Sequence, residues 1–400
     1  MNIQNKIEKY LQLCLSKANR DKQRLWSDFL ALKPSRPLVN VYFYQYVWQR
    51  EIDDGRRNYD CPVADFIDKQ ISYRLWRWEN IDDDAPLEEF LRIPYDILHH
   101  AKQVNQYQNS LWGIDIELSQ NCDQGSYSVV PPIKTESDIE KITLPRFEPP
   151  QGLDELLERA ERITGGCLPV KVETERMHWG PFEYIVWFRG MENLFLDFID
   201  NPRLVHRLME IASAGIIQWQ RQRQAAGFID SELSFFGHVP YDDFCLHGDS
   251  ASLKSCWAYL HAQSSGTISP QMYEEFVQPY NERIAALVGR VYYHGCENLD
   301  RKAAVIKRLP NLRLFHISPW SNVEPILEEM GRGFAYEVHS HPTGVLSSYS
   351  DSDMSRELSS RSSIAAEVNH VLTLADVETV TGRLERVREW VRLANKTARV

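Results

Sequence analysis

The feature of this sequence that most constrains its fold is the alternation, after about residue 150, of short apolar runs with capped helical segments. Each run is rich in β-branched and aromatic residues, which favour strands. The clearest runs are CLPVKVE, RVYYHGC, LRLFHISPW, FAYEVHSH and NHVLTLADV. Because the strand–helix units recur about every 25 to 30 residues, we expect eight between about residue 165 and the C-terminus, closed into a (β/α)8 TIM barrel.

Local sequence signals indicate where several helices begin. Three of the eight expected strands are less clearly marked. Asn201 followed by Pro202 is typical of an N-cap and a first helical residue, and Ser321 with Glu324 forms a capping-box pattern. The three remaining strands are expected within WGPFEYIVWFRG, SELSFFGHVPYDDF and WAYLHAQSSG.

The chain is expected to divide near the Pro-rich segment RFEPPQG. Residues 1–150 are predicted to form an N-terminal extension packed on the barrel, with helices and loops in the first hundred residues. A β-hairpin is predicted from LWGIDIELSQ and GSYSVVPPI, joined by a turn around Asn121, Asp123 and Gly125. Residues 151–400 are predicted to form the barrel itself.

Composition excludes several classes of protein. The 400 residues, 43% of them hydrophobic, suffice for a large core, and 45 basic against 56 acidic residues give a net charge of -11 without a basic stripe, so nucleic acid is not an expected partner. No apolar run approaches the roughly 20 residues that span a bilayer, and we expect a soluble cytoplasmic protein. Seven widely spaced cysteines without a CxxC pair indicate reduced thiols instead of a disulfide framework.

Polar side chains stand in pairs where three predicted strands end. The pairs are Glu173 with Glu175, His294 with Cys296, and His339 with His341. Side chains two apart on a strand leave from the same face, and the active sites of such barrels lie at the carboxyl ends of the strands. Each pair is therefore expected to face one site.

The pair His294 and Cys296 indicates a metal ligand set, because imidazole nitrogen and thiolate both bind zinc at about 2.0 to 2.3 Å. The alternative is a histidine beside a buried cysteine, without metal. His339 and His341 are candidates for further ligands or for general acid and base, although a histidine before proline is also typical of a surface loop. Glu173 is a candidate catalytic carboxylate or third metal ligand, and a purely structural role is equally consistent with its position.

Four more residues are candidates for binding the substrate. Trp179 and Trp320 are expected to wall the pocket with aromatic surface, and Glu175 and Glu297 to supply polar contacts. The alternative for the tryptophans is a place in the core.

Three longer segments carry a resemblance to a known family. GTISPQMYEEFVQPYNERIAAL, VYYHGCENLD and LPNLRLFHISPWSNVEPILEEMG resemble the second half of the uroporphyrinogen decarboxylase-like superfamily, and the similarity extends over roughly residues 110 to 395. That superfamily contains porphyrinogen decarboxylases, corrinoid-dependent methyltransferases and cobalamin-independent methionine synthases. The resemblance implies a β/α barrel and one of these chemistries.

Two departures narrow what the resemblance implies. True uroporphyrinogen decarboxylases carry an arginine motif of the form RQAGRY, and WQREIDDGRR does not match it. The HxC pair instead matches the zinc motif of the methyltransferase branch, which implies zinc on His294 and Cys296. That branch usually supplies another cysteine from its last strand region, and none follows Cys296 here. Either Glu173, His339 or Glu297 completes the shell, or the metal has been lost.

Three functions remain open from the sequence. The first is a methyltransferase that passes a methyl group between a corrinoid on a partner protein and a small molecule, with zinc activating the nucleophile. The second is a cofactor-free decarboxylase or related lyase acting on a carboxylated substrate, in which buried arginine and histidine stabilise a developing carbanion, with Arg176 and Arg189 as the candidate arginines. The third is a barrel that has lost catalysis and binds a ligand or partner.

Overall fold

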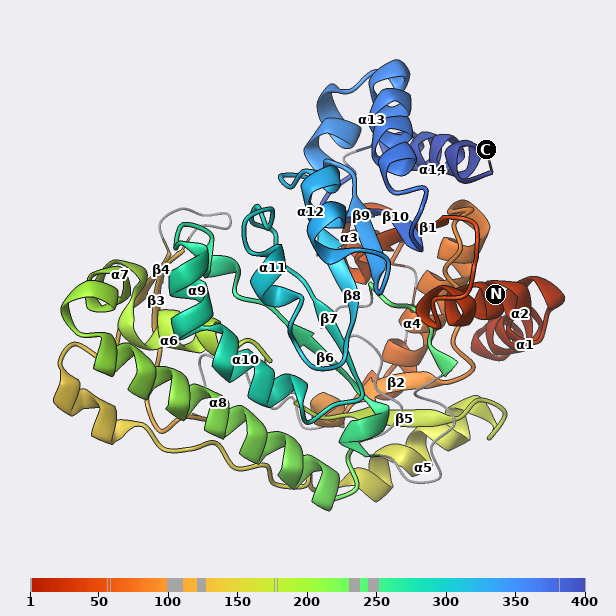
Figure 1. Ribbon diagram of the computed structural model, residues 1–400. Coiled ribbons are helices and arrows are strands. Elements are labelled where there is room, and N and C mark those ends of the chain that lie inside the picture. Colours follow the sequence, from red (N-terminus) through yellow and green to blue (C-terminus); the bar gives the residue numbers. More distant parts are fainter. Residues whose placement is uncertain are drawn as a thin grey trace.

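The structure is a computed structural model, and it describes residues 2–55, 57, 59–98, 111–120, 127–175, 177, 179–229, 238–243, 252–380 and 382–399. A six-stranded parallel sheet, curled into a half-barrel, forms its centre (Figure 1). In spatial order its strands are β1 (Leu38–Phe43), β10 (His370–Val377), β9 (Ala335–His339), β8 (Leu312–Ile317), β7 (Arg290–Tyr293) and β6 (Trp257–Leu260). Their carboxyl ends therefore meet at one edge.

Two smaller sheets accompany the half-barrel. β2 (Leu91–Pro94) pairs in parallel with β5 (Val170–Glu173), and β3 (Glu117–Gln120) pairs with β4 (Tyr127–Val130) in the antiparallel sense. The predicted hairpin is confirmed by the second pair, while its turn residues lie outside the described ranges. The predicted closed barrel of eight strands is not established, because the described parallel strands form two separate sheets.

Helices surround the half-barrel, and α14 packs against β1 while α10 packs against β6 (Figure 1). The α-helices are α1 (Ile3–Cys14), α2 (Lys17–Leu30), α3 (Gln45–Glu51), α4 (Pro62–Asn80), α5 (Leu153–Thr164), α6 (Pro181–Arg189), α7 (Met191–Asp200), α8 (Pro202–Ala225), α9 (Pro270–Phe276), α10 (Gln278–Ala285), α11 (Ala303–Ile306), α12 (Val323–Met330), α13 (Asp351–Ile364) and α14 (Leu384–Ala398). Short 3-10 segments are η1 (Tyr95–Leu98), η2 (Glu136–Lys141), η4 (Leu253–Ser255) and η5 (Gln263–Ser265), and η6 (Gly344–Ser348) is a π-turn.

Of the three uncertain strand segments, WAYL is confirmed as β6, and most of SELSFFGHVPYDDF lies outside the described residues. The expectation for WGPFEYIVWFRG was wrong, because it contains helix α6, which begins at Pro181 and is buried nearly all round. A short apolar run does not distinguish a buried strand from a buried helix. The N-cap at Asn201 is confirmed, whereas α12 begins after Asn322 without the predicted Ser321 cap.

The expectation of helices and loops in the first hundred residues was wrong for two segments, which form β1 and β2. LVNVYF is a continuous β-branched and aromatic run, and its strand β1 pairs with β10 near the end of the chain. Within the described residues, the half-barrel therefore joins segments from both sides of residue 150.

The free edge of β1 is covered by side chains from the last turn of α4 and from the segment that follows it. Asp84 accepts a hydrogen bond from the Val39 amide at 2.8 Å, and Asp83 accepts one from the Val41 amide at 2.8 Å. Arg77 donates to the Val41 carbonyl at 2.8 Å and pairs with Asp83 at 2.6 Å. Because these groups occupy the positions of a neighbouring strand, they satisfy the edge of the sheet without closing it.

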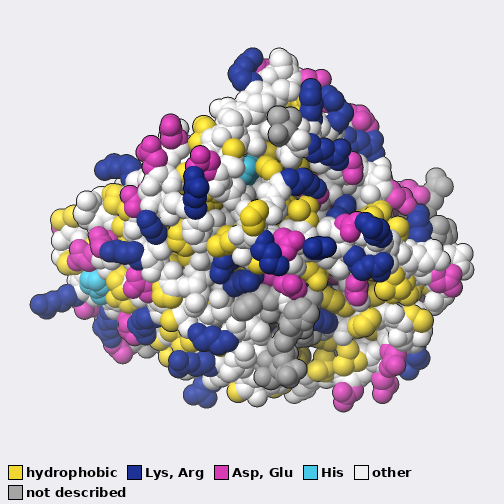
Figure 2. Space-filling view, turned by 45° about the vertical axis from the view of Figure 1, so that its right-hand side comes forward, with side chains coloured by type: hydrophobic (Ala, Val, Ile, Leu, Met, Phe, Trp, Pro, Cys, Tyr) yellow, Lys and Arg dark blue, Asp and Glu magenta, His cyan; other side chains and the backbone are white. Residues whose placement is uncertain are grey.

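The surface in Figure 2 carries basic and acidic side chains interspersed, without a broad stripe of one sign on the face in view. Among the described residues, no helix combines the length and the apolar composition that a membrane crossing requires.

The Asp83 contacts yield a stability prediction. Asp83→Ala leaves the partly buried Arg77 guanidinium and the Val41 amide without their buried partner, and we expect a loss of about 3 kcal/mol in the free energy of unfolding. The control is Asp82→Ala, because the Asp82 side chain is exposed. Urea unfolding of both variants measures the difference, and equal losses would contradict the role given to Asp83.

Candidate metal centre

The register of three neighbouring strands gathers polar side chains on one face of the half-barrel. His316 on β8 is paired with Glu337 on β9, and His339 lies two residues beyond Glu337 on the same face. His294 follows β7 directly, two residues after Tyr292. The carboxyl ends of β7, β8 and β9 therefore present one cluster, as expected for parallel strands.

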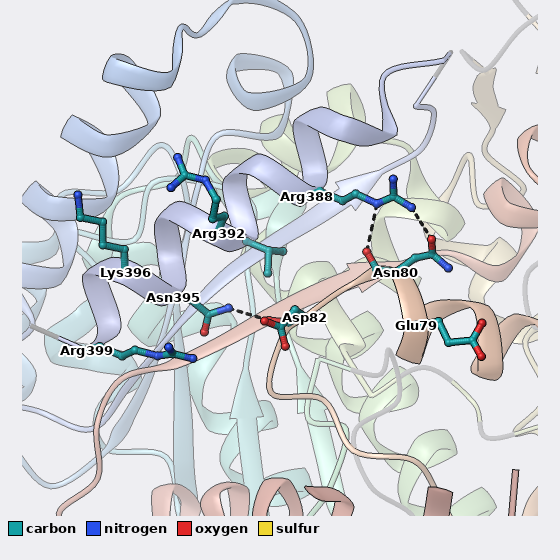
Figure 3. A pocket seen from close by; sticks show the side chains of 9 residues that line it. Glu79, Asn80, Asp82, Arg388, Arg392, Asn395, Lys396 and Arg399 are labelled. Carbon is teal, nitrogen blue, oxygen red and sulfur yellow. Dashed lines mark hydrogen bonds between the residues drawn. The ribbon is translucent and has the colours of Figure 1, made fainter. Parts of the chain in front are cut away.

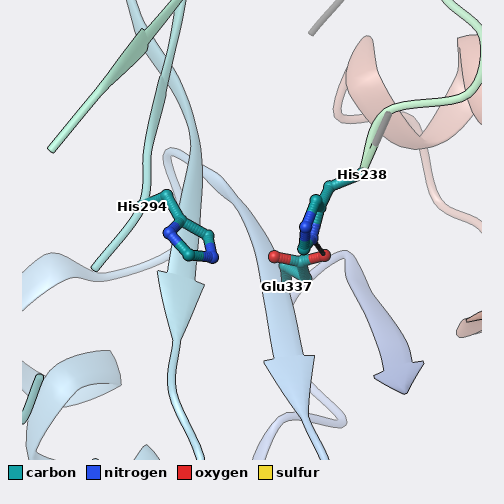
Figure 4. Close-up of side chains that lie close together, drawn as sticks. All are labelled: His238, His294 and Glu337. Carbon is teal, nitrogen blue, oxygen red and sulfur yellow. Dashed lines mark hydrogen bonds and ion pairs between the residues drawn. The ribbon is translucent and has the colours of Figure 1, made fainter. Parts of the chain in front are cut away.

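Glu337 is the centre of this cluster and is fully buried. Nδ1 of His238 lies 2.9 Å from one carboxylate oxygen, and Nδ1 of His316 lies 2.8 Å from the other (Figure 4 shows His238 beside Glu337). The Tyr292 hydroxyl donates to the same oxygen as His316. Burial by itself raises the pKa of this carboxyl, but His238 and His339 outweigh that effect and hold the net pKa well below its ordinary value. Glu337 is therefore an anion held by three donors.

The histidine rings surround this anion at close range. The ring centroids of His294 and His316 are 4.0 Å apart, those of His316 and His339 are 4.3 Å apart, and the His238 and His339 rings stack at 5.6 Å. Each of the four side chains is at most 6% exposed. The cluster is thus a packed, water-excluding group of imidazoles around one carboxylate.

Burial keeps two of the imidazoles, those of His294 and His316, neutral. It lowers the pKa of His294 well below the ordinary 6.5, with further lowering from His316 and His238, and it lowers the pKa of His316 to about 3. Within the described part of the chain, no hydrogen-bond partner reaches Nδ1 of His294 or Nε2 of His316 and His339. Buried polar atoms without partners are rare, and an unseen ion is one ordinary explanation.

The donor geometry fits a metal ion. The ligand atoms of His238, His294 and Glu337 lie within 4.8 Å of one another, and so do those of His316, Glu337 and His339. Imidazole nitrogen and carboxylate oxygen are ordinary zinc ligands, and neutral imidazole is the form that binds. The Nδ1 contact of His316 with Glu337 also orients that ring, so that its Nε2 lone pair faces away from the carboxylate.

Of the predicted metal pair, only His294 lies in these groups. Cys296 is partly exposed and belongs to neither of them. Burial, with added repulsion from Asp376, Glu297 and Glu337, raises the pKa of its thiol to about 12. Without a metal, this thiol stays protonated at neutral pH.

Glu297 lies beside a different set of polar groups. Its carboxylate packs against Gly295, where a Cβ atom would come within 2.3 Å of Oε2. Burial raises its pKa to about 7, lowered in part by Lys302 and raised again by Glu183. Glu183 is itself held by Ser264, at 2.9 and 2.6 Å. The structure does not bring Glu297 into the metal groups.

His341 and Trp320 lie together outside the cluster. The His341 ring meets the edge of the Trp320 ring at 4.5 Å, and Nδ1 of His341 accepts from the Gly344 amide at 3.3 Å. Trp320 is 59% exposed, so it stands at the surface. His339, by contrast, is the strand residue that joins the metal groups.

The two carboxylates after β5 also lie apart from the cluster. Glu173 ends β5 in the small sheet, half-exposed and 3.8 Å from Arg92. Glu175 accepts from the Met177 amide at 2.8 Å and lines a separate cavity of about 320 Å³ with Trp219. Trp179 is 3% exposed and part of the large core, the alternative considered for it.

The arginines proposed for a decarboxylase gain no support. Arg189 pairs with Asp197 at 2.6 Å and donates to the carbonyls of Ile133 and Lys134, on the helical side of the fold. Arg176 lies outside the described residues.

Sequence reasoning missed three members of the cluster, His238, His316 and Glu337. Two of them had a usable signal, because Glu337 stands two residues before His339 in YEVHSH and His316 lies near the end of the strand-like run LRLFHI. On β9 the structure groups Glu337 with His339, both within the strand, whereas His341 lies beyond its end. His238 lies between α8 and β6, and no periodic pattern marks it.

Comparisons with known proteins support the fold. No protein-family model matches the chain, and no curated protein matches it in sequence. Its structure is similar to that of a methyltransferase from Methanosarcina mazei, with a TM-score of 0.55, 13% sequence identity, and coverage of 94% of this chain and 98% of the other. This likeness shows a shared fold along nearly the whole length of both chains.

The neutral histidines predict a pH dependence of stability. The pKa values of His294 and His316 in the folded protein lie below 6.5, the ordinary value that applies in the unfolded chain. As the pH falls below about 6.5, the unfolded chain therefore binds protons before the folded protein does, and the free energy of unfolding decreases. In chelator-treated protein we expect each to contribute a loss approaching about 1.4 kcal/mol per pH unit between pH 6 and 5. His316→Gln should flatten this slope, and His206→Gln, at a half-exposed ring, should not. Urea unfolding at several pH values measures how the free energy of unfolding changes with pH. The same pH dependence in both variants would refute the role given to His316.

Proposed function

We propose that this chain is a zinc-dependent methyltransferase, which transfers a methyl group between a corrinoid carried by a partner protein and a small-molecule donor or acceptor. The observation that carries the proposal is the buried cluster of four histidines around Glu337 at the strand ends. The likeness in fold to a methyltransferase supports the choice of reaction, and the HxC resemblance supports zinc.

The proposed zinc set differs from the one that the resemblance implies. His294 is retained, and nitrogen and oxygen donors from His238, Glu337, His316 and His339 replace the thiolates. The sequence has no cysteine after Cys296 that could supply a further thiolate. In the proposed set, Glu337 supplies an anionic ligand instead. Zinc bound there would supply Lewis acidity that favours the deprotonated, nucleophilic form of a bound thiol or alcohol.

The chain's own residues have separate roles in this proposal. Tyr292 and the histidine N–H groups hold the Glu337 carboxylate in place and keep it ionised. The lowered pKa values of His294 and His316 keep nitrogen lone pairs available at neutral pH. Burial of all these groups excludes water, which strengthens every electrostatic contact within the cluster.

The decarboxylase alternative lacks a comparable observation. Such an enzyme needs cationic groups that stabilise a developing carbanion. Of the two arginines considered for that role, Arg189 is paired with Asp197 and Arg176 lies outside the described residues.

Metal analysis of protein purified without chelator tests the proposal. We expect about one zinc ion per chain in the wild type, strong loss in Glu337→Gln and His294→Ala, and retention in the matched control Cys296→Ser. Glu337→Gln preserves the shape of the side chain but removes its charge. Loss of zinc in Cys296→Ser, together with full zinc content in Glu337→Gln, would contradict the proposed ligand set.

The reaction itself is tested by mixing the zinc-loaded protein with a methylated corrinoid and a small thiol. We expect demethylation of the corrinoid, followed by its absorption spectrum, at a rate at least about 100-fold lower in Glu337→Gln. The rate in Arg189→Gln should equal that of the wild type, since Arg189 lies outside the cluster. Release of carbon dioxide from a carboxylated substrate by chelator-treated protein would favour the decarboxylase instead.

A further inference from the structure

A row of polar side chains extends the histidine cluster across the half-barrel, from β9 to β10 and β1. His339 on β9 is paired with Thr373 on β10, and Thr373 is paired with Asn40 on β1. Partners on neighbouring strands lie about 5 Å apart and carry their side chains on the same face of the sheet. Because His339 belongs to the metal groups, Thr373 and Asn40 face the same interior as the cluster.

The outer face of this part of the sheet is covered by a helix. α14 packs against β1 and is fixed to the end of α4, because Arg388 donates to the backbone and side-chain oxygens of Asn80 (Figure 3). Successive side chains on a strand point to opposite faces. The buried Leu372 and Leu374 therefore take the outer side of β10, and Thr373 takes the inner side.

The two new members of this row differ in whether their polar atoms have partners. Asn40 is buried, and its side-chain amide donates to the His238 carbonyl at 3.4 Å. Thr373 is fully buried, and its hydroxyl has no hydrogen-bond partner among the described residues. An unpaired buried hydroxyl costs free energy, and a bound molecule that accepts its hydrogen bond removes that cost. Thr373 is therefore a donor in position for a ligand beside His339.

We infer that the Thr373 hydroxyl binds the small-molecule substrate, donating a hydrogen bond to the sulfur or oxygen atom that exchanges the methyl group. The inference rests on the proposed function, which requires that atom to lie beside the histidine cluster. A hydroxyl adds no charge to the site, and its hydrogen bond is strongest to an anionic acceptor. Thr373 thereby favours the deprotonated, nucleophilic form of a thiol or alcohol.

Calorimetry with zinc-loaded protein tests this contact, and ethanethiol is the probe because sulfur is its only polar atom. We expect Thr373→Val, which lacks the hydroxyl, to bind ethanethiol about tenfold or more weakly than the wild type. Thr373→Ser retains the hydroxyl, and we expect it to bind within about twofold of the wild type. Both variants should contain as much zinc as the wild type, since Thr373 is not among the metal groups.

A stability measurement separates ligand binding from a structural role of the hydroxyl. In chelator-treated protein, Thr373→Val removes a buried hydroxyl without a partner among the described residues, so its urea midpoint should equal or exceed that of the wild type. The matched control is Thr164→Val, at another buried threonine, whose hydroxyl donates to the Glu161 carbonyl at 3.3 Å. The control should lower the urea midpoint and leave the affinity for ethanethiol unchanged.

Several results would overturn the inference. These are wild-type affinity for ethanethiol in Thr373→Val, weakened binding that Thr373→Ser does not restore, and loss of zinc or of stability in Thr373→Val. Wild-type protein that binds zinc but no ethanethiol overturns it as well. Wild-type protein that takes up no zinc contradicts the proposed function, and this inference with it, so the two failures are distinguishable.

Discussion

The buried negative charge of Glu337 is the constraint on which the candidate site depends. A carboxylate without exposure to solvent is costly unless donors surround it, and this one has His238, His316 and Tyr292. Those contacts fix the direction of the rings, because each Nδ1 turned to Glu337 leaves the other ring nitrogen free to face elsewhere. The arrangement leaves Nδ1 of His294 and Nε2 of His316 without a hydrogen bond among the described residues, and Nε2 of His339 has only a 3.5 Å ion-pair contact with Glu337. A cation bound among these side chains would contact the histidine nitrogen atoms and would also compensate the negative charge of Glu337.

The half-barrel supplies the frame for that charge. Three parallel strands in register place His316 opposite Glu337, and the period of two along β9 adds His339 to the same face. At the β1 edge, Asp83 and Asp84 accept the hydrogen bonds of the Val41 and Val39 amides, as the carbonyls of another strand would. The strand order and register thus place His294, His316, Glu337 and His339 on one face, whether or not the sheet closes.

Part of the site was predictable, and the failures have identifiable causes. His294 and His339 were found because each ends a strand-like run, where the carboxyl edge of a parallel sheet places functional groups. Cys296 and His341 were grouped with them by applying the two-residue period beyond the strand ends, where the chain has already turned. Trp179 and Trp320 illustrate the same limit, since one is in the core and the other at the surface, and local sequence carries no signal that separates them.

The sequence by itself determined the class of fold, because alternating apolar runs and capped helices leave little besides a parallel sheet with helical cover. It also indicated that His294 and His339 each stand at the end of a strand. Only the tertiary structure decided which of them meet, since that depends on the register between β7, β8 and β9 and on His238, which arrives from a segment without periodicity. It likewise decided that β1, from the N-terminal part, pairs with β10, because contacts between residues hundreds of positions apart are set by packing and not by local pattern.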